Sequence, residues 1–168
     1  YWPTEDMSNI QRTRRLGLLS EVVGDRLRIK VREELGAGYS PRSHNLSSPS
    51  FTDYGYLFAM VQAAPDQSEK VADVILAIAK DLHENGVSED ELNRAKLPLL
   101  TQIETYRRNN GYWMGSVLQN SQEVPARLDW ARSFISDYES ISKAELDELA
   151  KTYLDPAKAL QVLIMPKE

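Results

Sequence analysis

The chain has 168 residues, of which 42% are hydrophobic and 27% charged, with a formal net charge of −5 and no cysteine. This length suits one domain over residues 1–168, and the lack of cysteine excludes disulfides, thiolate catalysis and cysteine-bound zinc. The acidic balance and the scattered basic residues argue against nucleic acid as a partner, and no apolar run reaches the roughly 20 residues that membrane insertion needs. The start at Tyr1-Trp2-Pro3, without an initiator methionine or a signal peptide, predicts a fragment of a longer chain, truncated at its N-terminus.

The first predicted element is a long helix. Hydrophobic residues recur at near-helical spacing over residues 7–35. Gly17 and Gly24 interrupt this pattern, which predicts a bend or a close helix contact. Gly36 and Gly38 then end the helix, because glycine enters left-handed backbone conformations without the steric cost that other residues meet.

Two strands are expected next. Residues 39–48 are polar and predicted to be extended, and residues 54–64 are apolar on both faces, which is typical of a central strand. A final strand is predicted over residues 160–165, because this segment is rich in β-branched and other apolar residues.

Between these strands the pattern indicates several helices. The first starts near Asp66, which itself or through its neighbour is expected to cap the helix, and ends at Asn85-Gly86. Capping boxes at residues 88–91 and 142–145 open two others, and Pro98 is expected to kink or split the first of these. Further helices are predicted over residues 112–118 and 125–138.

The order of these elements does not alternate strand and helix as a doubly wound fold does. It predicts the α+β class, with a two-layer sandwich in which an antiparallel-rich mixed sheet carries helices packed on one face. A strand that ends near Tyr1 and Trp2 would also place these aromatic residues in the sheet.

Most candidate chemical sites have a simpler structural interpretation. The two histidines, His44 and His83, are far apart and lack a cluster of acids at ligand spacing, so neither is expected to bind metal. His83 is interpreted as a solvent-facing residue near a helix end, and His44 as an exposed loop residue or part of a groove wall. No G-x-S-x-G sequence marks a serine nucleophile, and no glycine-rich loop precedes a helix to bind phosphate. The aromatic residues at 112–114 are interpreted as core packing.

Arg32 and Tyr39 remain as candidates, because the glycine corner between them can hold a guanidinium and a phenol at one place. Two simpler interpretations stay open. Arg32 is also explained as a cation that stabilises the helix dipole or pairs with a nearby carboxylate, and Tyr39 as a half-buried strand residue.

The sequence R-E-E-L-G-A-G-Y-S, residues 32–40, resembles a motif in the C-terminal, zinc-free domains of the pitrilysin and insulinase (M16) family of zinc metallopeptidases. Members of that family place an arginine seven residues before a tyrosine across the same turn, as Arg32 and Tyr39 stand here. The resemblance extends over nearly the whole chain. It includes the entry at residues 2–4, the helix at residues 18–31, the strand at residues 54–61, the helix start at residues 88–96 and the approach to the closing strand at residues 153–156. The family's zinc motif, H-x-x-E-H, is absent, which is the pattern of the non-catalytic type of domain.

The resemblance implies a domain without catalytic residues, metal ligands or a cofactor of its own. Its partner would be a zinc-bearing domain, in the same chain or in a separate subunit, and its substrate a peptide enclosed between the two. Arg32 and Tyr39 would bind that peptide, with Tyr39 suited to stabilise the developing oxyanion and Arg32 to hold a backbone carbonyl. A bacterial periplasmic location is expected from the same resemblance.

Two alternatives belong to other functional classes. One is a purely structural scaffold of the same fold, like the core proteins of a respiratory complex, with no contribution to catalysis. The other is an independent small hydrolase or ligand-binding module, which would need a cofactor site that the sequence does not indicate.

Overall fold

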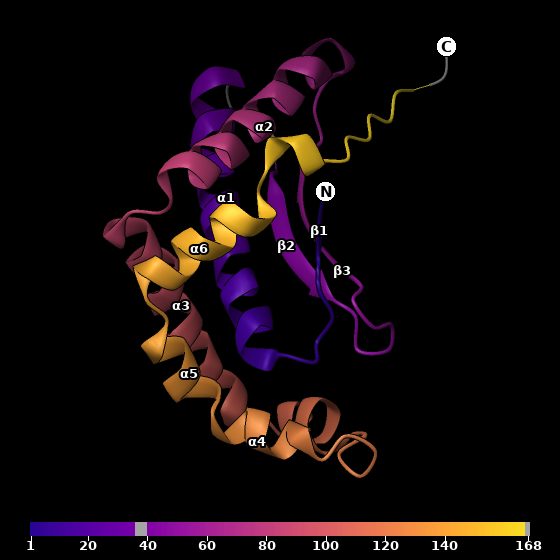
Figure 1. Cartoon of the computed structure of the whole chain (residues 1–168), viewed down its shortest axis with the longest axis vertical. Helices are drawn as coiled ribbons and strands as arrows, with labels where there is room; N and C mark the ends of the chain where they lie inside the picture. Colours follow the sequence, from indigo (N-terminus) through magenta and orange to yellow (C-terminus); the bar gives the residue numbers. More distant parts are fainter. Residues whose placement is uncertain (36–39, 167–168) are drawn as a thin grey trace.

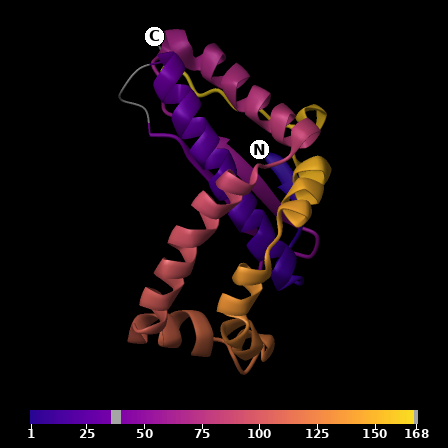
Figure 2. The same cartoon turned by 90° about the vertical axis from the view of Figure 1, so that its left-hand side faces the viewer.

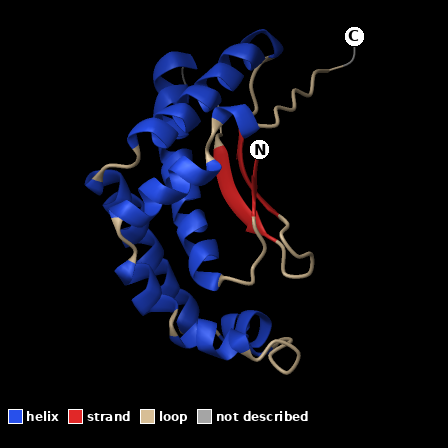
Figure 3. Cartoon of the chain, in the orientation of Figure 1, coloured by secondary structure: helices blue, strands red, loops and turns tan. Residues whose placement is uncertain are grey.

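The structure is a computed structural model that describes residues 1–35 and 40–166, with the side chains of this part except those of residues 34 and 35. Its main helices lie on one side of a small sheet, as Figures 1 and 3 show. The predicted α+β class with helices packed on one face is confirmed. In chain order the elements are β1 (Trp2–Thr4), α1 (Ile10–Leu35), β2 (Arg42–Ser47), β3 (Gly55–Met60), η1 (Pro65–Gln67), α2 (Ser68–Asn85), α3 (Glu89–Arg107), η2 (Tyr112–Leu118), α4 (Ala126–Arg132), α5 (Phe134–Ser140), α6 (Lys143–Tyr153) and η3 (Pro156–Lys158).

The sheet has three strands in the order β1-β3-β2, and both pairings between these described strands are antiparallel. The sequence prediction that residues 54–64 contain a central strand is therefore confirmed. Gly55 begins this strand where three chain segments meet. A Cβ atom at this position would lie 2.3 Å from the carbonyl oxygen of Glu5 and 2.9 Å from that of Leu46, so only glycine fits without a shift of the backbone.

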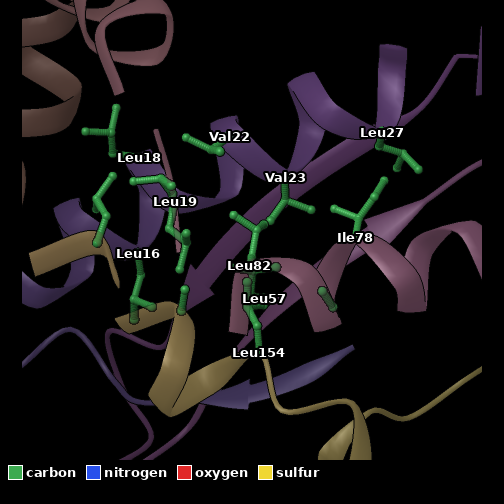
Figure 4. Close-up of a cluster of buried hydrophobic side chains, with 14 of the residues drawn as sticks. Leu16, Leu18, Leu19, Val22, Val23, Leu27, Leu57, Ile78, Leu82 and Leu154 are labelled. Atoms are coloured by element: carbon green, nitrogen blue, oxygen red, sulfur yellow. The ribbon is translucent and has the colours of Figure 1, made fainter. Parts of the chain in front are cut away.

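Helix α1 is the centre of the core and contacts the sheet and helices α2, α3, α5 and α6. Figure 4 shows its buried side chains meeting those of β3, α2 and the end of α6. Full burial of one such leucine or valine contributes roughly 1.5–3 kcal/mol relative to exposure. The fully buried members of this cluster include Leu16, Leu18, Leu19, Val22, Leu27, Leu57, Leu82 and Leu154.

The two glycines inside α1 differ in their surroundings. A Cβ atom on Gly24 would lie 3.6 Å from the Cβ atom of Ser43, so this glycine lets α1 pack closely against strand β2 and not against another helix. A Cβ atom on Gly17 would have no atom within 4 Å, so no contact with a described neighbouring element explains this glycine.

The helix boundaries follow the capping signals closely. Both capping boxes are present, with Ser88 opening α3 and Ser142 opening α6. Gly86 ends α2 with a φ of 73°, a conformation that favours glycine. Asp66 lies in the short 3-10 turn η1, and its neighbour Gln67 stands at the N-cap of α2 without a side-chain hydrogen bond to the helix. Helix α3 continues through Pro98, so the expected split is wrong, whereas the alternative of a kink stays a prediction.

The lower part of the molecule differs from the prediction in two ways. Residues 112–118 form a π-helical turn, and the helix expected over residues 125–138 is divided at Ser133 into α4 and α5. Figure 2 shows α3 leading away from α1 toward these short helices. Arg14 accounts for the position of the break, because its guanidinium donates to the carbonyl oxygen of Trp130 at 2.6 Å and to the Ser133 hydroxyl at 3.3 Å.

The predicted strand over residues 160–165 is wrong for this structure. Leu160 exchanges two backbone hydrogen bonds with Tyr1, of 2.8 and 3.0 Å, but the following residues form no strand. They are exposed, including Ile164 at 91%. A strand needs a neighbour to satisfy its backbone groups, and no described strand lies beside this segment past Tyr1. No helix in the described ranges combines the length and apolar character needed to cross a membrane.

Candidate functional site

Arg32 lies in the last turn of α1, which ends at Leu35. Leu27 and Val31 are buried on the core side of this helix, whereas Arg32 is exposed. The helical repeat explains the difference, because successive residues are rotated by about 100° and only those three or four apart share a face. The core residues of α1 therefore hold the guanidinium of Arg32 on the solvent side of the helix end.

Arg32 forms no ion pair or hydrogen bond with any residue of the described ranges, although Lys30 and Glu33 beside it lie 3.9 Å apart as a weak pair. The alternative in which Arg32 pairs with a nearby carboxylate therefore has no support in this part of the chain. A cation at this end of a helix still interacts favourably with the helix dipole. Tyr39 lies outside the described residues, so its predicted position beside Arg32 stays a prediction.

The sheet face that is turned away from α1 carries a group of aromatic rings that the sequence analysis did not identify as a surface. Tyr1 lies over Phe58 with ring centroids 6.0 Å apart, and Tyr56 lies 5.7 Å from Tyr1 and 6.2 Å from Phe58. Tyr54 continues the row at 6.3 Å from Tyr56. The alternation of aromatic residues at 54, 56 and 58 was the available signal, because residues two apart on a strand share a face.

The two histidines have different environments. His44 is exposed on β2, where its ring lies edge-on to Phe58 with centroids 5.9 Å apart. His83 is half-buried near the end of α2, and its Nδ1 atom has no hydrogen-bond partner in the described part of the chain. The described residues hold no group of three or more histidine, cysteine, aspartate or glutamate side chains placed to bind a metal ion. These residues therefore do not fit a resident zinc ion.

The aromatic residues at 112–114 pack only in part. Tyr112 is half-buried and stacks on Phe134 with an interplanar angle of 8°, and the indole nitrogen of Trp113 donates to the carbonyl oxygen of Arg107 at 2.8 Å. Met114, which follows these two aromatic residues, is 66% exposed.

The most strongly buried charges connect α1 to α5 and α6. Arg14 and Arg15 each lie 2.9 Å from one carboxylate oxygen of Asp137, and Arg15 also bonds to Glu145 at 2.7 Å. A backbone hydrogen bond from Ser142 is the largest contribution that lowers the pKa of Glu145, and the bond from Arg15 lowers it further. These groups pair with each other inside the fold, which indicates a structural function.

The first 99 residues match the family model described as the peptidase M16 inactive domain. Among curated proteins, the chain is 33% identical over 127 residues to the chloroplastic stromal processing peptidase of Pisum sativum, and 31% identical over 129 residues to that of Arabidopsis thaliana. These alignments cover 74% and 76% of this chain but only 10% of either relative. The chain thus spans about a tenth of the length of these curated relatives.

Solved structures with lower sequence identity share the fold. A protease from Helicobacter pylori matches 94% of this chain with a TM-score of 0.77 at 14% identity, over 38% of its own length. The periplasmic protease PqqL from Escherichia coli matches 91% with a TM-score of 0.70 at 18% identity, over 17% of its length. A putative zinc protease from Bordetella pertussis Tohama I matches 94% with a TM-score of 0.71 at 15% identity, over 86% of its length.

Proposed function

The chain belongs to the M16 peptidase family as an inactive domain, and we propose that it closes a peptide-binding chamber over the zinc site of another domain. In this proposal Arg32 and Tyr39 bind the peptide from the side opposite the zinc. The zinc-bearing partner is a second M16 domain, in the same chain or in a separate subunit. Peptides are proposed as substrates because the curated relatives are named processing peptidases.

The observation that supports this proposal is the position of Arg32. Its guanidinium is exposed at the end of α1 and has no ion-pair partner among the described residues, so it is available to a ligand. Arginine presents several donors in a rigid planar arrangement, which suits a backbone carbonyl of an extended peptide. The core residues of α1 fix the helix beneath it, so little ordering is needed when the ligand binds.

Tyr39 would act on the reacting group itself. Hydrolysis of a peptide bond develops negative charge on the carbonyl oxygen, and a positioned phenol can donate a hydrogen bond to that oxygen. Removal of one such donor lowers the rate by about a hundredfold or more. Arg32 would hold the peptide in register for the same step, which improves its orientation relative to the scissile bond.

The test measures peptide cleavage by the assembled enzyme, in which this domain is combined with its zinc-bearing half. Tyr39→Phe is expected to lower kcat by about a hundredfold with little change in KM, because the donor acts mainly in the transition state. Arg32→Ala is expected to raise KM and lower kcat/KM. Both variants should unfold at the same denaturant concentration as the parent.

Matched substitutions separate a specific function from general damage. Tyr54→Phe removes a hydroxyl from an exposed tyrosine, and Arg132→Ala removes an exposed arginine from α4, so both should leave turnover unchanged. Unchanged turnover in Arg32→Ala and Tyr39→Phe as well would contradict the proposal. It would favour a purely structural scaffold that stabilises the zinc-bearing half.

A further inference from the structure

The face of the sheet that points away from α1 carries no helix of the described chain, as Figures 1 and 3 show. Side chains alternate across a strand, so the strand registers determine which residues share this outward sheet face. His44 of β2 stands opposite Phe58 of β3. Leu46 stands opposite Tyr56 in the same way. Tyr1, which precedes β1, lies over Phe58, so large side chains from the neighbouring segments gather around β3.

Much of the outward sheet face is open to solvent. Tyr1 is 41% exposed, and Leu46 and Met60 are each 44% exposed. The rings of Tyr1, Tyr56 and Phe58 lie 5.7 to 6.2 Å apart and meet at angles of 29° to 58°. Because these rings are tilted, a further aromatic ring can pack against an edge or a face. A contiguous apolar patch of this kind is typical of a surface that binds another molecule.

The charge on this face favours a ligand with a carboxylate. The residues of β1, β2 and β3 include one arginine and no acidic residue, although the whole chain has a net charge of −5. That arginine, Arg42, stands opposite Met60 and shares the outward face by the same alternation. It is exposed and forms no ion pair within the described ranges. An acidic group is therefore the complementary charge at this end of the face.

The position of Arg42 relates the outward sheet face to the proposed site. Arg42 and Arg28 line the same groove beside α1, and Arg32 follows Arg28 by about one helical turn. The two exposed arginines, Arg32 and Arg42, thus lie toward the same end of the domain, where a peptide that contacts Arg32 can continue over the sheet. A second copy of the chain is a poorer occupant, because both copies carry the same net negative charge.

We propose that the outward sheet face binds aromatic side chains of a peptide and that Arg42 pairs with an acidic side chain of the same peptide. The choice of a peptide rests on the proposed function, whereas the binding uses only residues of this chain and needs no zinc. Side chains above the plane of the sheet make the contacts, not main-chain hydrogen bonds at a strand edge. The face thereby selects peptides by their sequence, which Arg32, proposed to hold the peptide backbone, does not.

The experiment measures the fluorescence anisotropy of a short labelled peptide on the 168-residue chain. The probe peptide carries two phenylalanines two positions apart, followed by a glutamate, among glycine and serine residues. Replacement of both phenylalanines by serine should weaken binding by about tenfold or more, and replacement of the glutamate by lysine by about threefold. Methylation of the peptide nitrogens should change the affinity by less than about twofold, because strand pairing is not involved.

Two tyrosines of similar exposure give a matched comparison. Tyr1→Ala removes a ring from the outward sheet face and should weaken binding by about fivefold. Tyr106→Ala removes a tyrosine that is 48% exposed on α3, on the helical side of the domain, and should have no effect. Arg42→Ala should abolish the preference for glutamate over lysine, whereas Arg132→Ala on α4 should retain it.

Equal binding of the phenylalanine and serine peptides, equal effects of Tyr1→Ala and Tyr106→Ala, or loss of binding on methylation would each overturn the inference. Self-association of the chain that Tyr1→Ala removes would also overturn it, because a second copy would then occupy the face. A failure of the proposed function would appear separately, as unchanged turnover in Arg32→Ala and Tyr39→Phe while the outward sheet face still binds its peptide.

Discussion

Asp137→Ala tests whether the buried ion pairs determine how the helices pack. The side chain of Asp137 is 4% exposed, and each of its carboxylate oxygens lies 2.9 Å from an arginine nitrogen, of Arg14 on one side and Arg15 on the other. The Arg14 side chain is itself only 6% exposed. After the substitution Arg15 keeps its ion pair with Glu145, whereas the remaining partners of Arg14 within the described residues are neutral.

The expected magnitude follows from the charge that would remain unpaired. Removal of one partner from a buried ion pair costs roughly 3–5 kcal/mol, mostly because the other charge stays buried without compensation. The carbonyl oxygen of Trp130 and the ring of Phe134, 5.0 Å from the guanidinium carbon, still stabilise Arg14 in part. For a chain of this length the loss corresponds to a fall in Tm of roughly 6–20 °C.

The assay is urea unfolding followed by circular dichroism, with the free energy of unfolding extrapolated to water. Asp129→Ala is the matched control, because Asp129 and Arg132 form a pair of the same types at 2.7 Å with both side chains about three-quarters exposed. That substitution should cost less than about 1 kcal/mol. The double replacement Arg14→Met/Asp137→Leu should recover much of the loss, since no charge is then buried. Equal losses for Asp137→Ala and Asp129→Ala would refute the reasoning.

Further predictions concern a carboxylate and three single residues. Burial acts to raise the pKa of Glu91, but hydrogen bonds from Arg26 and Ser88 lower it from 4.5 to about 2. This group therefore contributes stability above pH 4.5 that is lost as the pH falls through about 2, and urea unfolding at several pH values should show a smaller decline in Glu91→Gln. Gly17→Ala should raise stability by roughly 0.5–1 kcal/mol in the same assay, because the position is helical and open. Gly55→Ala should lower stability, since its Cβ atom would overlap backbone oxygens, and an unchanged unfolding midpoint would contradict that contact. Ser142→Ala should cost about 1 kcal/mol through loss of the cap, and a loss near zero would show that α6 depends on packing alone.

Local signals in the sequence were sufficient for several elements. The capping boxes at Ser88 and Ser142 involve residues only three positions apart, so each helix start could be read without knowledge of its neighbours. The helix stop at Gly86 followed from the backbone conformations that glycine can adopt. The central position of β3 followed from a sequence segment that is apolar on both faces. The candidate site residue Arg32 came from a similar short pattern together with the family resemblance.

Tertiary structure decided what depends on distant residues. The burial of Arg14 and Arg15 could not be predicted, because their carboxylate partner Asp137 is more than 120 positions away and arginine is usually exposed. The segment at residues 160–165 has the composition of a strand but, past Tyr1, has no strand beside it in the described part of the chain to satisfy its backbone. The outward sheet face likewise exists only because β1 and β2 both pair with β3. Helix caps and turns are governed by interactions a few residues apart, which the sequence by itself determines, whereas pairing, burial and continuous surfaces arise only when the elements pack together.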